Sequence, residues 1–140
     1  MTTVEELRAA IDAARAAAAA EQPSNARDLV LRILAAASDV PAVRDALADV
    51  PAGRALLRFT DTAEAIEFQA GDGRLHAEAA DVRGTGPKVD ATSATWLGLM
   101  AGTLRPWLAF TRGMVVCRAG IAELRWLQQV AERLQKAYAG

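Results

Sequence analysis

The chain has 140 residues, a length that suits one domain burying roughly two thirds of its unfolded surface without disulfides or metals. Sixteen basic and 17 acidic residues leave a net charge of −1, whereas binding to nucleic-acid phosphates needs a basic excess or stripe. The single cysteine, Cys117, excludes an intrachain disulfide and a cysteine-cluster metal site. We therefore expect no nucleic-acid partner, no metal and no cofactor.

The amino terminus does not resemble a signal peptide, because Glu5 and Glu6 occupy positions where basic residues would be expected. No apolar run approaches the ~20 residues that a bilayer-spanning helix requires. These features predict a cytoplasmic protein with no integral membrane segment.

Up to about residue 53 the chain is rich in alanine and has helical periodicity. Thr3 and Glu6 have the spacing of a capping box that begins a first helix, whose apolar stripe is Val4, Leu7, Ile11 and Ala14. Pro23 interrupts it, Ser24 or Asn25 can cap a second helix, and that helix has the apolar face Leu29, Val30, Ile33, Leu34 and Ala37. A third, shorter helix is predicted from Pro41.

From Arg54 the apolar period becomes two, which predicts three half-buried antiparallel strands. Their inward residues are Leu57 and Phe59, then Ile66, Phe68 and Ala70, then Leu75, Ala77 and Ala79. Asp61-Thr62 indicates the first turn, and Gly71-Asp72-Gly73 supplies the positive-φ positions of a tight hairpin.

The remaining elements alternate between short strands and helices. A loop over 82–87 precedes a strand over 88–92, and Ser93 is the expected cap of a helix that ends at Gly102. A short helix follows from Pro106 to Gly113, then a strand over 114–118 and an amphipathic helix over 121–138. Helices segregated around an antiparallel meander indicate the α+β class.

The chain offers few candidates for catalysis. His76 is alone and alternates onto the polar side of its strand, while Cys117 follows Val115 and Val116 and is expected to be a small buried hydrophobe. A reactive thiolate would need nearby positive charge, but Arg118 should point to the opposite face. No nucleophile-elbow, zinc-protease, P-loop or dinucleotide-binding pattern occurs.

Large apolar side chains are concentrated between residues 96 and 126, where all three Trp and two of the three Met lie. A core is the ordinary explanation for any one of them. As a set on short helices over a small sheet, they can also line an adaptable apolar cavity. The set is Trp96, Leu97, Leu99, Met100, Leu104, Trp107, Leu108, Phe110, Met114 and Trp126.

From Val89 the sequence reads VDATSATWLGLMAGTLRPWLAFTRGMVVCRAG, which resembles the carboxyl half of sterol carrier protein type-two domains. Gly102, Leu104 and Pro106 match that family's G-x-L-x-P link, and Phe110 and Gly113 match the A-F helix and the glycine after it. Upstream, residues 54–80 resemble the family's opening three-stranded meander, so the resemblance covers about residues 40–138. Two features depart from the family: the step Arg118-Ala119-Gly120 and the bulky Trp126.

The resemblance implies a five-stranded, mainly antiparallel sheet covered by helices, with a tunnel for a sterol, fatty acyl chain or similar lipid between the sheet and the carboxyl-terminal helices. It divides the chain into a helical amino-terminal extension, 1–39, and a lipid-binding domain, 40–140. We predict that the largest apolar side chains of the last third contribute most of the cavity lining: Trp96, Met100, Trp107, Phe110, Met114 and Trp126.

The function expected from these features is non-catalytic binding or carriage of an apolar ligand. Two alternatives remain open: an accessory subunit that presents a hydrophobic intermediate to a partner enzyme, and a small enzyme acting on an apolar substrate. The first helix needs a surface to cover its apolar stripe, and packing within the domain is favoured over a homodimer.

Overall fold

The computed structural model describes residues 3–18, 25–118 and 120–139. Ser24 lies outside these residues, as does the side chain of Thr3 in the expected capping box. The helices of this part of the chain are α1 (Thr3–Ala18), α2 (Ala26–Ala37), α3 (Pro41–Leu47), α4 (Ser93–Ala101), α5 (Pro106–Thr111) and α6 (Ile121–Ala139). The strands are β1 (Gly53–Phe59), β2 (Glu64–Gly71), β3 (Arg74–Ala80), β4 (Lys88–Ala91) and β5 (Val116–Cys117).

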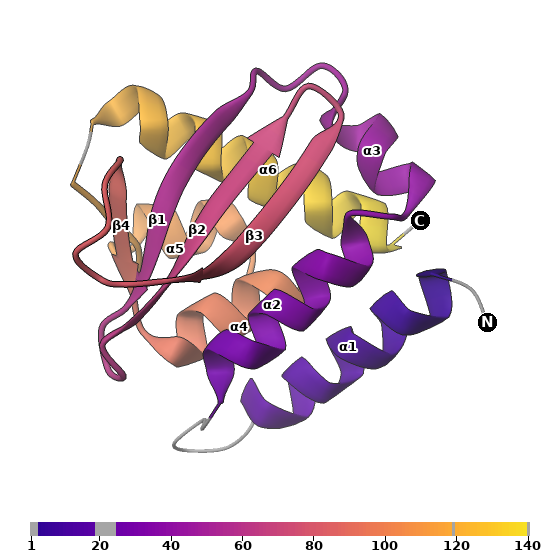
Figure 1. Cartoon of the computed structure of the whole chain (residues 1–140), viewed down its shortest axis with the longest axis horizontal. Helices are drawn as coiled ribbons and strands as arrows, with labels where there is room; N and C mark the ends of the chain where they lie inside the picture. Colours follow the sequence, from indigo (N-terminus) through magenta and orange to yellow (C-terminus); the bar gives the residue numbers. More distant parts are fainter. Residues whose placement is uncertain (1–2, 19–24, 119, 140) are drawn as a thin grey trace.

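The five strands form one sheet in the order β3-β2-β1-β4-β5. β2 pairs antiparallel with β1 and with β3, and β4 pairs antiparallel with β5, whereas β1 and β4 run parallel. Figure 1 shows the long β1–β2–β3 meander with the shorter β4 beside β1. The α+β class and the mainly antiparallel sheet predicted from the sequence are therefore confirmed.

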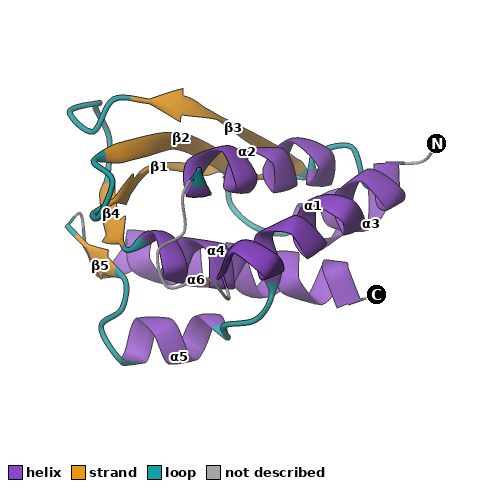
Figure 2. Cartoon of the chain, turned by 90° about the horizontal axis from the view of Figure 1, so that it is seen from below, coloured by secondary structure: helices purple, strands orange, loops and turns teal. Residues whose placement is uncertain are grey.

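The sheet and the helices form layers (Figure 2). The sheet is at the top of that view, α4, α6 and α5 lie beneath it, and α2 packs beside β3. The inward face of the sheet is buried at Leu57 and Phe59 of β1, Ile66 and Phe68 of β2 and Val89 of β4. Alternation of apolar and polar residues thus places the core between the strands and the helices.

The two-residue turn between β2 and β3 is the tight hairpin that the sequence predicts. Gly71, Asp72 and Gly73 have φ values of 113°, 55° and 74°, so the turn needs residues that tolerate the left-handed region. Gly71 is also in close contact with the chain, since a Cβ there would lie 2.3 Å from the carbonyl oxygen of Pro51. The Asp72 N–H donates to Val50 O at 2.7 Å.

α1 packs within the chain, against α2 and α4. Leu7, Ala10, Ile11 and Ala14 are buried at the three- and four-residue steps of one helix face. Val4, the first residue of the predicted stripe, is 45% exposed. α2 has Asn25 at its N-cap in the left-handed region (φ 51°), without a side-chain capping bond.

The expected cap of α4 is one residue off. The N-cap is Thr92, whose side chain accepts from the Thr95 N–H, and Ser93 is the first helical residue. Ser93 is fully buried, and its N–H and hydroxyl both donate to Asp61 Oδ1, at 2.9 and 2.8 Å. The serine thus joins the start of α4 to the β1–β2 turn, a long-range contact that local capping patterns do not reveal.

β5 is shorter than the strand predicted over 114–118. The Met114 N–H donates to Ala109 O at 2.9 Å, so this residue completes the end of α5 instead of pairing with β4. Gly113 has the expected left-handed conformation, φ 70°. Cys117 is half-buried, not buried as predicted, because β5 is the edge strand and has β4 as its only neighbour in the sheet.

Candidate functional site

Two of the six predicted lining residues, Trp96 and Met100, lie one turn apart on α4 and are 1% and 4% exposed. The Trp96 indole N–H donates to Arg58 O at 2.9 Å, and its ring lies 6.2 Å from that of Phe59. The indole therefore has its polar atom satisfied and its ring packed on the sheet, as a buried Trp requires.

Trp126 contacts a different part of the core, under β2. Its ring lies 6.1 Å from Phe68, and its indole N–H donates to Pro51 O at 2.8 Å. The bulk that departs from the family pattern is accommodated at Gly53, where a Cβ would approach the Trp126 ring to 2.6 Å.

The other three predicted residues are on or just after α5. Trp107 is 52% exposed and Met114 is 39% exposed, whereas Phe110 packs partly buried against the core. The six residues are thus divided among the core under β1, the core under β2 and the surface of α5. That they line one cavity stays a prediction.

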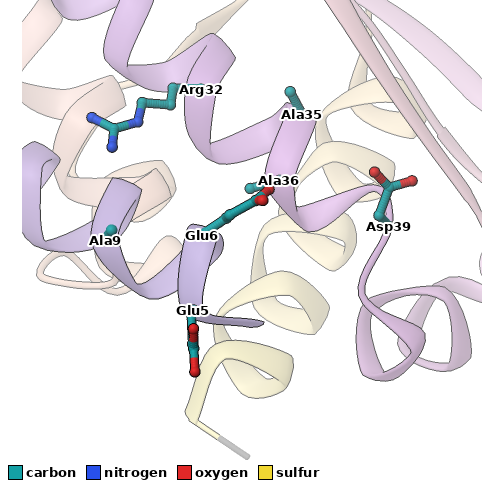
Figure 3. A pocket seen from close by; sticks show the side chains of 7 residues that line it. All are labelled: Glu5, Glu6, Ala9, Arg32, Ala35, Ala36 and Asp39. Carbon is teal, nitrogen blue, oxygen red and sulfur yellow. The ribbon is translucent and has the colours of Figure 1, made fainter. Parts of the chain in front are cut away.

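Two hollows flank α1, and none of the six residues lines either. The first, the α1–α2 hollow, has a volume of about 630 Å³ and is lined by Glu5, Glu6, Ala9, Arg32, Ala35, Ala36 and Asp39. Figure 3 shows Ala35 and Ala36 of α2 on one side of it, with Glu6 of α1 reaching toward Ala36. Its lining combines small alanines with three carboxylates and one guanidinium, so it has no large apolar side chain and has a net negative charge.

The second, the α1–α6 hollow, has a volume of about 580 Å³ and lies between α1, the start of α3, the end of α4 and the end of α6. Figure 1 shows the carboxyl end of α6 close to α3. Larger apolar side chains contribute to this lining, and it includes Val4, Leu7, Ile11, Val40, Ala42 and Ala137. Leu7 and Ile11 are buried, so the floor of this hollow is continuous with the core.

Hydrogen bonds fix the walls of the α1–α6 hollow. α4 ends at Gly102 in the left-handed region (φ 80°), and Arg15 Nε donates to Ala101 O at 3.0 Å, which ties α1 to the end of α4. The Gln135 side-chain amide donates to Leu99 O and Leu104 O at 2.9 and 2.8 Å, which ties α6 to the α4–α5 connection. All three bonds join segments that are distant in the sequence.

Charged groups border the α1–α6 hollow: Arg8, Asp12 and Arg15 from α1, and Arg105 from the residue before α5. Three guanidinium groups and one carboxylate leave an excess of two positive charges. All four residues are exposed, and within the described residues none of them belongs to an ion pair.

Tyr138 also lines the α1–α6 hollow. Its hydroxyl oxygen is buried and has no hydrogen-bond partner among the described residues. Leaving a buried hydroxyl unpaired costs about 1–3 kcal/mol. Burial raises the pKa of Tyr138 above its ordinary value of 10.0, because a low-dielectric environment disfavours the phenolate. The group is therefore a neutral hydroxyl that can still donate a hydrogen bond.

Arg8, Arg15, Arg105 and Tyr138 were not among the residues expected from the sequence to contact a ligand. Arg8, Asp12 and Arg15 are spaced four and three residues apart, which places them on one side of α1. That spacing is visible in the sequence but is typical of a solvated helix face. The approach of the α6 terminus and of Arg105 depends on tertiary packing.

The candidates for catalysis are elsewhere. His76 is exposed on β3, as the alternation predicts, with Nε2 3.9 Å from Glu78 Oε2. Cys117 Sγ lies 3.6 Å from Gly120 O at the sheet edge. The described residues contain no group of three or more His, Cys, Asp or Glu side chains that could hold a metal ion, and none of their helices has the length and hydropathy of a transmembrane span.

No family model and no curated protein sequence matches the chain. Among solved structures it is similar to the crystal structure of sterol carrier protein 2, with 22% identity, a TM-score of 0.55, and 81% of this chain and 92% of that chain covered. It is also similar to the solution structure of a conserved hypothetical protein from Thermus thermophilus, described there as a candidate sterol carrier protein. That match has 24% identity, a TM-score of 0.50, and covers 69% of this chain and 74% of the other. The chain therefore has the fold of sterol carrier protein 2, as its sequence resemblance indicates.

Proposed function

We propose that this protein binds a single apolar or amphipathic molecule of the lipid class in the α1–α6 hollow, without chemistry of its own. The observation that carries this proposal is an apolar floor, including Leu7 and Ile11, that opens from the core of an SCP2-like fold. Its volume of about 580 Å³ is within the ~300–1,000 Å³ typical of small-molecule sites.

The expected affinity is modest. About a dozen buried methylenes at ~0.8 kcal/mol each contribute roughly 10 kcal/mol, and association and ordering cost ~4–15 kcal/mol. The balance corresponds to weak to micromolar binding. A carrier that must release its ligand can work in this range.

The hollow differs in place from the site expected on sequence grounds, which lies around Trp96, Trp107 and Trp126. The two locations have different spectroscopic signatures, because no tryptophan lines the α1–α6 hollow. A ligand against the predicted set should shift the tryptophan fluorescence strongly. A ligand in the hollow should bind with little change in that emission.

A filling substitution tests the location directly. Ala42 lines the hollow and is exposed, so Ala42→Phe should occupy space in the hollow without disturbing the core. We expect it to weaken binding of a fluorescent fatty-acid probe at least tenfold with an unchanged melting temperature. Ala122→Phe, at an exposed position near the other end of α6, is the matched control and should bind like the parent.

The class of ligand can be sought first by extracting the purified protein with organic solvent and identifying co-purified lipid by mass spectrometry. If no lipid is extracted and a panel of fatty acids and sterols leaves the probe undisplaced, the binding function is wrong. If Ala42→Phe binds as well as the parent while tryptophan emission shifts, the site is the one predicted from the sequence.

A second candidate function, an accessory subunit, is favoured by the exposed apolar side chains near α5 and the start of α6. Trp107 is 52% exposed and Ile121 is 67% exposed, as at surfaces that contact another protein. On this hypothesis the protein self-associates or pairs with an enzyme through this end. Light scattering of the parent and of Trp107→Ser would support it if the parent exceeds the monomer mass and the variant does not.

A further inference from the structure

The two hollows beside α1 differ in the sign of their charge. The α1–α2 hollow has three carboxylates and one guanidinium, whereas the α1–α6 hollow has three guanidiniums and one carboxylate. Of these two hollows, the one with the larger apolar residues therefore has the excess of positive charge, in a chain whose net charge is only −1. This arrangement favours a ligand with an apolar chain and a negative head.

The arginines of the α1–α6 hollow retain free donors. The side chains of Arg8 and Arg105 have no hydrogen bond or ion pair within the described residues, and Arg15 uses Nε for Ala101 O. A guanidinium carries five N–H donors in a planar fork that suits a carboxylate or phosphate. Arg15 can thus hold the end of α4 and still present its terminal nitrogens.

Tyr138 is a second and independent observation. The residue is part of the lining of the same hollow, and its buried hydroxyl lacks a partner among the described residues. A neutral hydroxyl of this kind is completed by an acceptor oxygen on a ligand. The guanidiniums attract negative charge, and the hydroxyl needs an oxygen acceptor, so both requirements are met by one oxyanion.

We propose that the α1–α6 hollow selects single-chain lipids with an oxyanionic head: the head is bound by Arg8, Arg105 and the Tyr138 hydroxyl, and the chain lies on Leu7 and Ile11. This inference rests on the proposed function and names the chemistry of the ligand. A neutral sterol offers one hydroxyl oxygen as an acceptor and no negative charge to pair with the guanidiniums of Arg8 and Arg105. The shared chemistry is that of a fatty carboxylate or a monoalkyl phosphate.

The test compares three ten-carbon ligands that differ only in the head: decanoate, 1-decanol and decylammonium. Titration calorimetry on the full chain at pH 7 should rank decanoate first, roughly tenfold tighter than decanol, with decylammonium weakest. The preference should shrink at high salt, since the screening length falls from ~10 Å at 0.1 M to ~3 Å at 1 M. Decyl phosphate binding more tightly than decanoate would identify phosphate as the preferred oxyanion.

Variants assign the head group to named residues. Arg8→Gln and Arg105→Gln should each weaken decanoate roughly threefold and leave decanol unchanged. Arg32→Gln, which removes one guanidinium from the α1–α2 hollow, is the matched control and should bind decanoate like the parent. Tyr138→Phe should weaken decanoate while raising the melting temperature by about 3–5 °C, because it removes an unpaired hydroxyl.

The outcomes separate this inference from the proposed function. Equal affinity for the three ligands, or decanoate binding that is indifferent to both arginine variants, overturns the oxyanion proposal and leaves apolar binding standing. Tighter binding of decylammonium also overturns it. Failure of all three ligands to bind overturns both proposals.

Discussion

Replacing Asp90 with asparagine tests how much the outer face of the sheet contributes to stability. The Asp90 side chain is 11% exposed and lies between two arginines. Arg58 donates to its two oxygens at 2.5 and 2.8 Å, and Arg118 Nε donates to Oδ2 at 2.8 Å. Because Arg58, Asp90 and Arg118 come from β1, β4 and the end of β5, the carboxylate joins three strands at the side of the sheet away from the core.

The magnitude follows from the burial of each partner. A buried hydrogen bond to a charged group contributes ~1.5–3 kcal/mol, and Arg58 is only 23% exposed. Arg118 is 61% exposed, so solvent screening reduces its contribution to a few tenths of a kcal/mol. We expect Asp90→Asn to lower the free energy of unfolding by about 2 kcal/mol, or the melting temperature by about 8 °C.

The loss should depend on pH. Burial acts to raise the pKa of Asp90, but the hydrogen bonds from Arg58 and Arg118 outweigh it and hold that pKa below the ordinary value of 3.8. A carboxylate with a lowered folded-state pKa stabilises the fold above its unfolded-state pKa, and the contribution disappears as the pH falls through the folded-state pKa. The difference between parent and variant should therefore be complete at pH 7, begin to shrink near pH 3.8 and vanish only below the lowered pKa of Asp90 in the folded state.

Thermal unfolding from pH 7 to pH 2.5, followed by circular dichroism, measures both effects. Asp49→Asn is the matched control: Asp49 also forms a two-bond pair, with Arg133 at 2.6 and 3.2 Å, but it is exposed. This control should melt close to the parent. If Asp90→Asn melts like Asp49→Asn at pH 7, the strands do not depend on this carboxylate and the reasoning is refuted.

Two further predictions concern the backbone of α5 and the docking of α1. Gly113→Val should lower the free energy of unfolding by about 1–2 kcal/mol through the positive φ alone, since a Cβ there meets nothing within 4 Å. Gly113→Asn should cost less in the same thermal melt. Equal melting temperatures for the parent and both variants would contradict the placement of the end of α5 at Gly113. Deleting residues 1–22 uncovers the surfaces of α2 and α4 that α1 buries, so the melting temperature should fall while the mass in solution stays that of the monomer. A dimer that becomes a monomer on deletion would instead favour self-association.

The fold was predictable where short-range rules determine the chain. Pro41 begins α3, the Gly71–Gly73 turn joins β2 to β3, and Gly113 has φ 70°, because each position depends on its immediate neighbours. Period-two alternation predicted the buried residues of β1 and β2, but on β3 only Leu75 of the predicted inward residues is buried and Ala79 is exposed. Two predictions were wrong for reasons that local patterns do not encode. Ser93 bonds to the distant Asp61 and does not cap α4, and Cys117 of β5 is only half-buried because that strand lies at the edge of the sheet.

The α1–α6 hollow was less accessible from the sequence. Large apolar side chains were the predicted ligand contacts, and in the structure the indole N–H of Trp96 donates to Arg58 O and that of Trp126 donates to Pro51 O; that these side chains line a cavity stays a prediction. The α1–α6 hollow is bordered by residues with ordinary surface patterns, such as Arg8 and Tyr138. Their convergence is a property of how α1, α4 and α6 pack, which a list of residue types does not specify.

The parallel pairing of β1 with β4 has a consequence for how the molecule assembles. β1, β2 and β3 are joined by short turns, so each can pair with its neighbour in the sequence. β4 pairs with β1 through residues as distant as Leu56 and Lys88, so this pairing requires closure of a long loop. We expect the meander to form early, with β4, α4, α5 and α6 docking later. Two of the helices that dock late, α4 and α6, also border the α1–α6 hollow, so this half of the protein should open at a lower free energy than the meander. Ligand entry and release would then require only a partial opening, during which the meander stays folded.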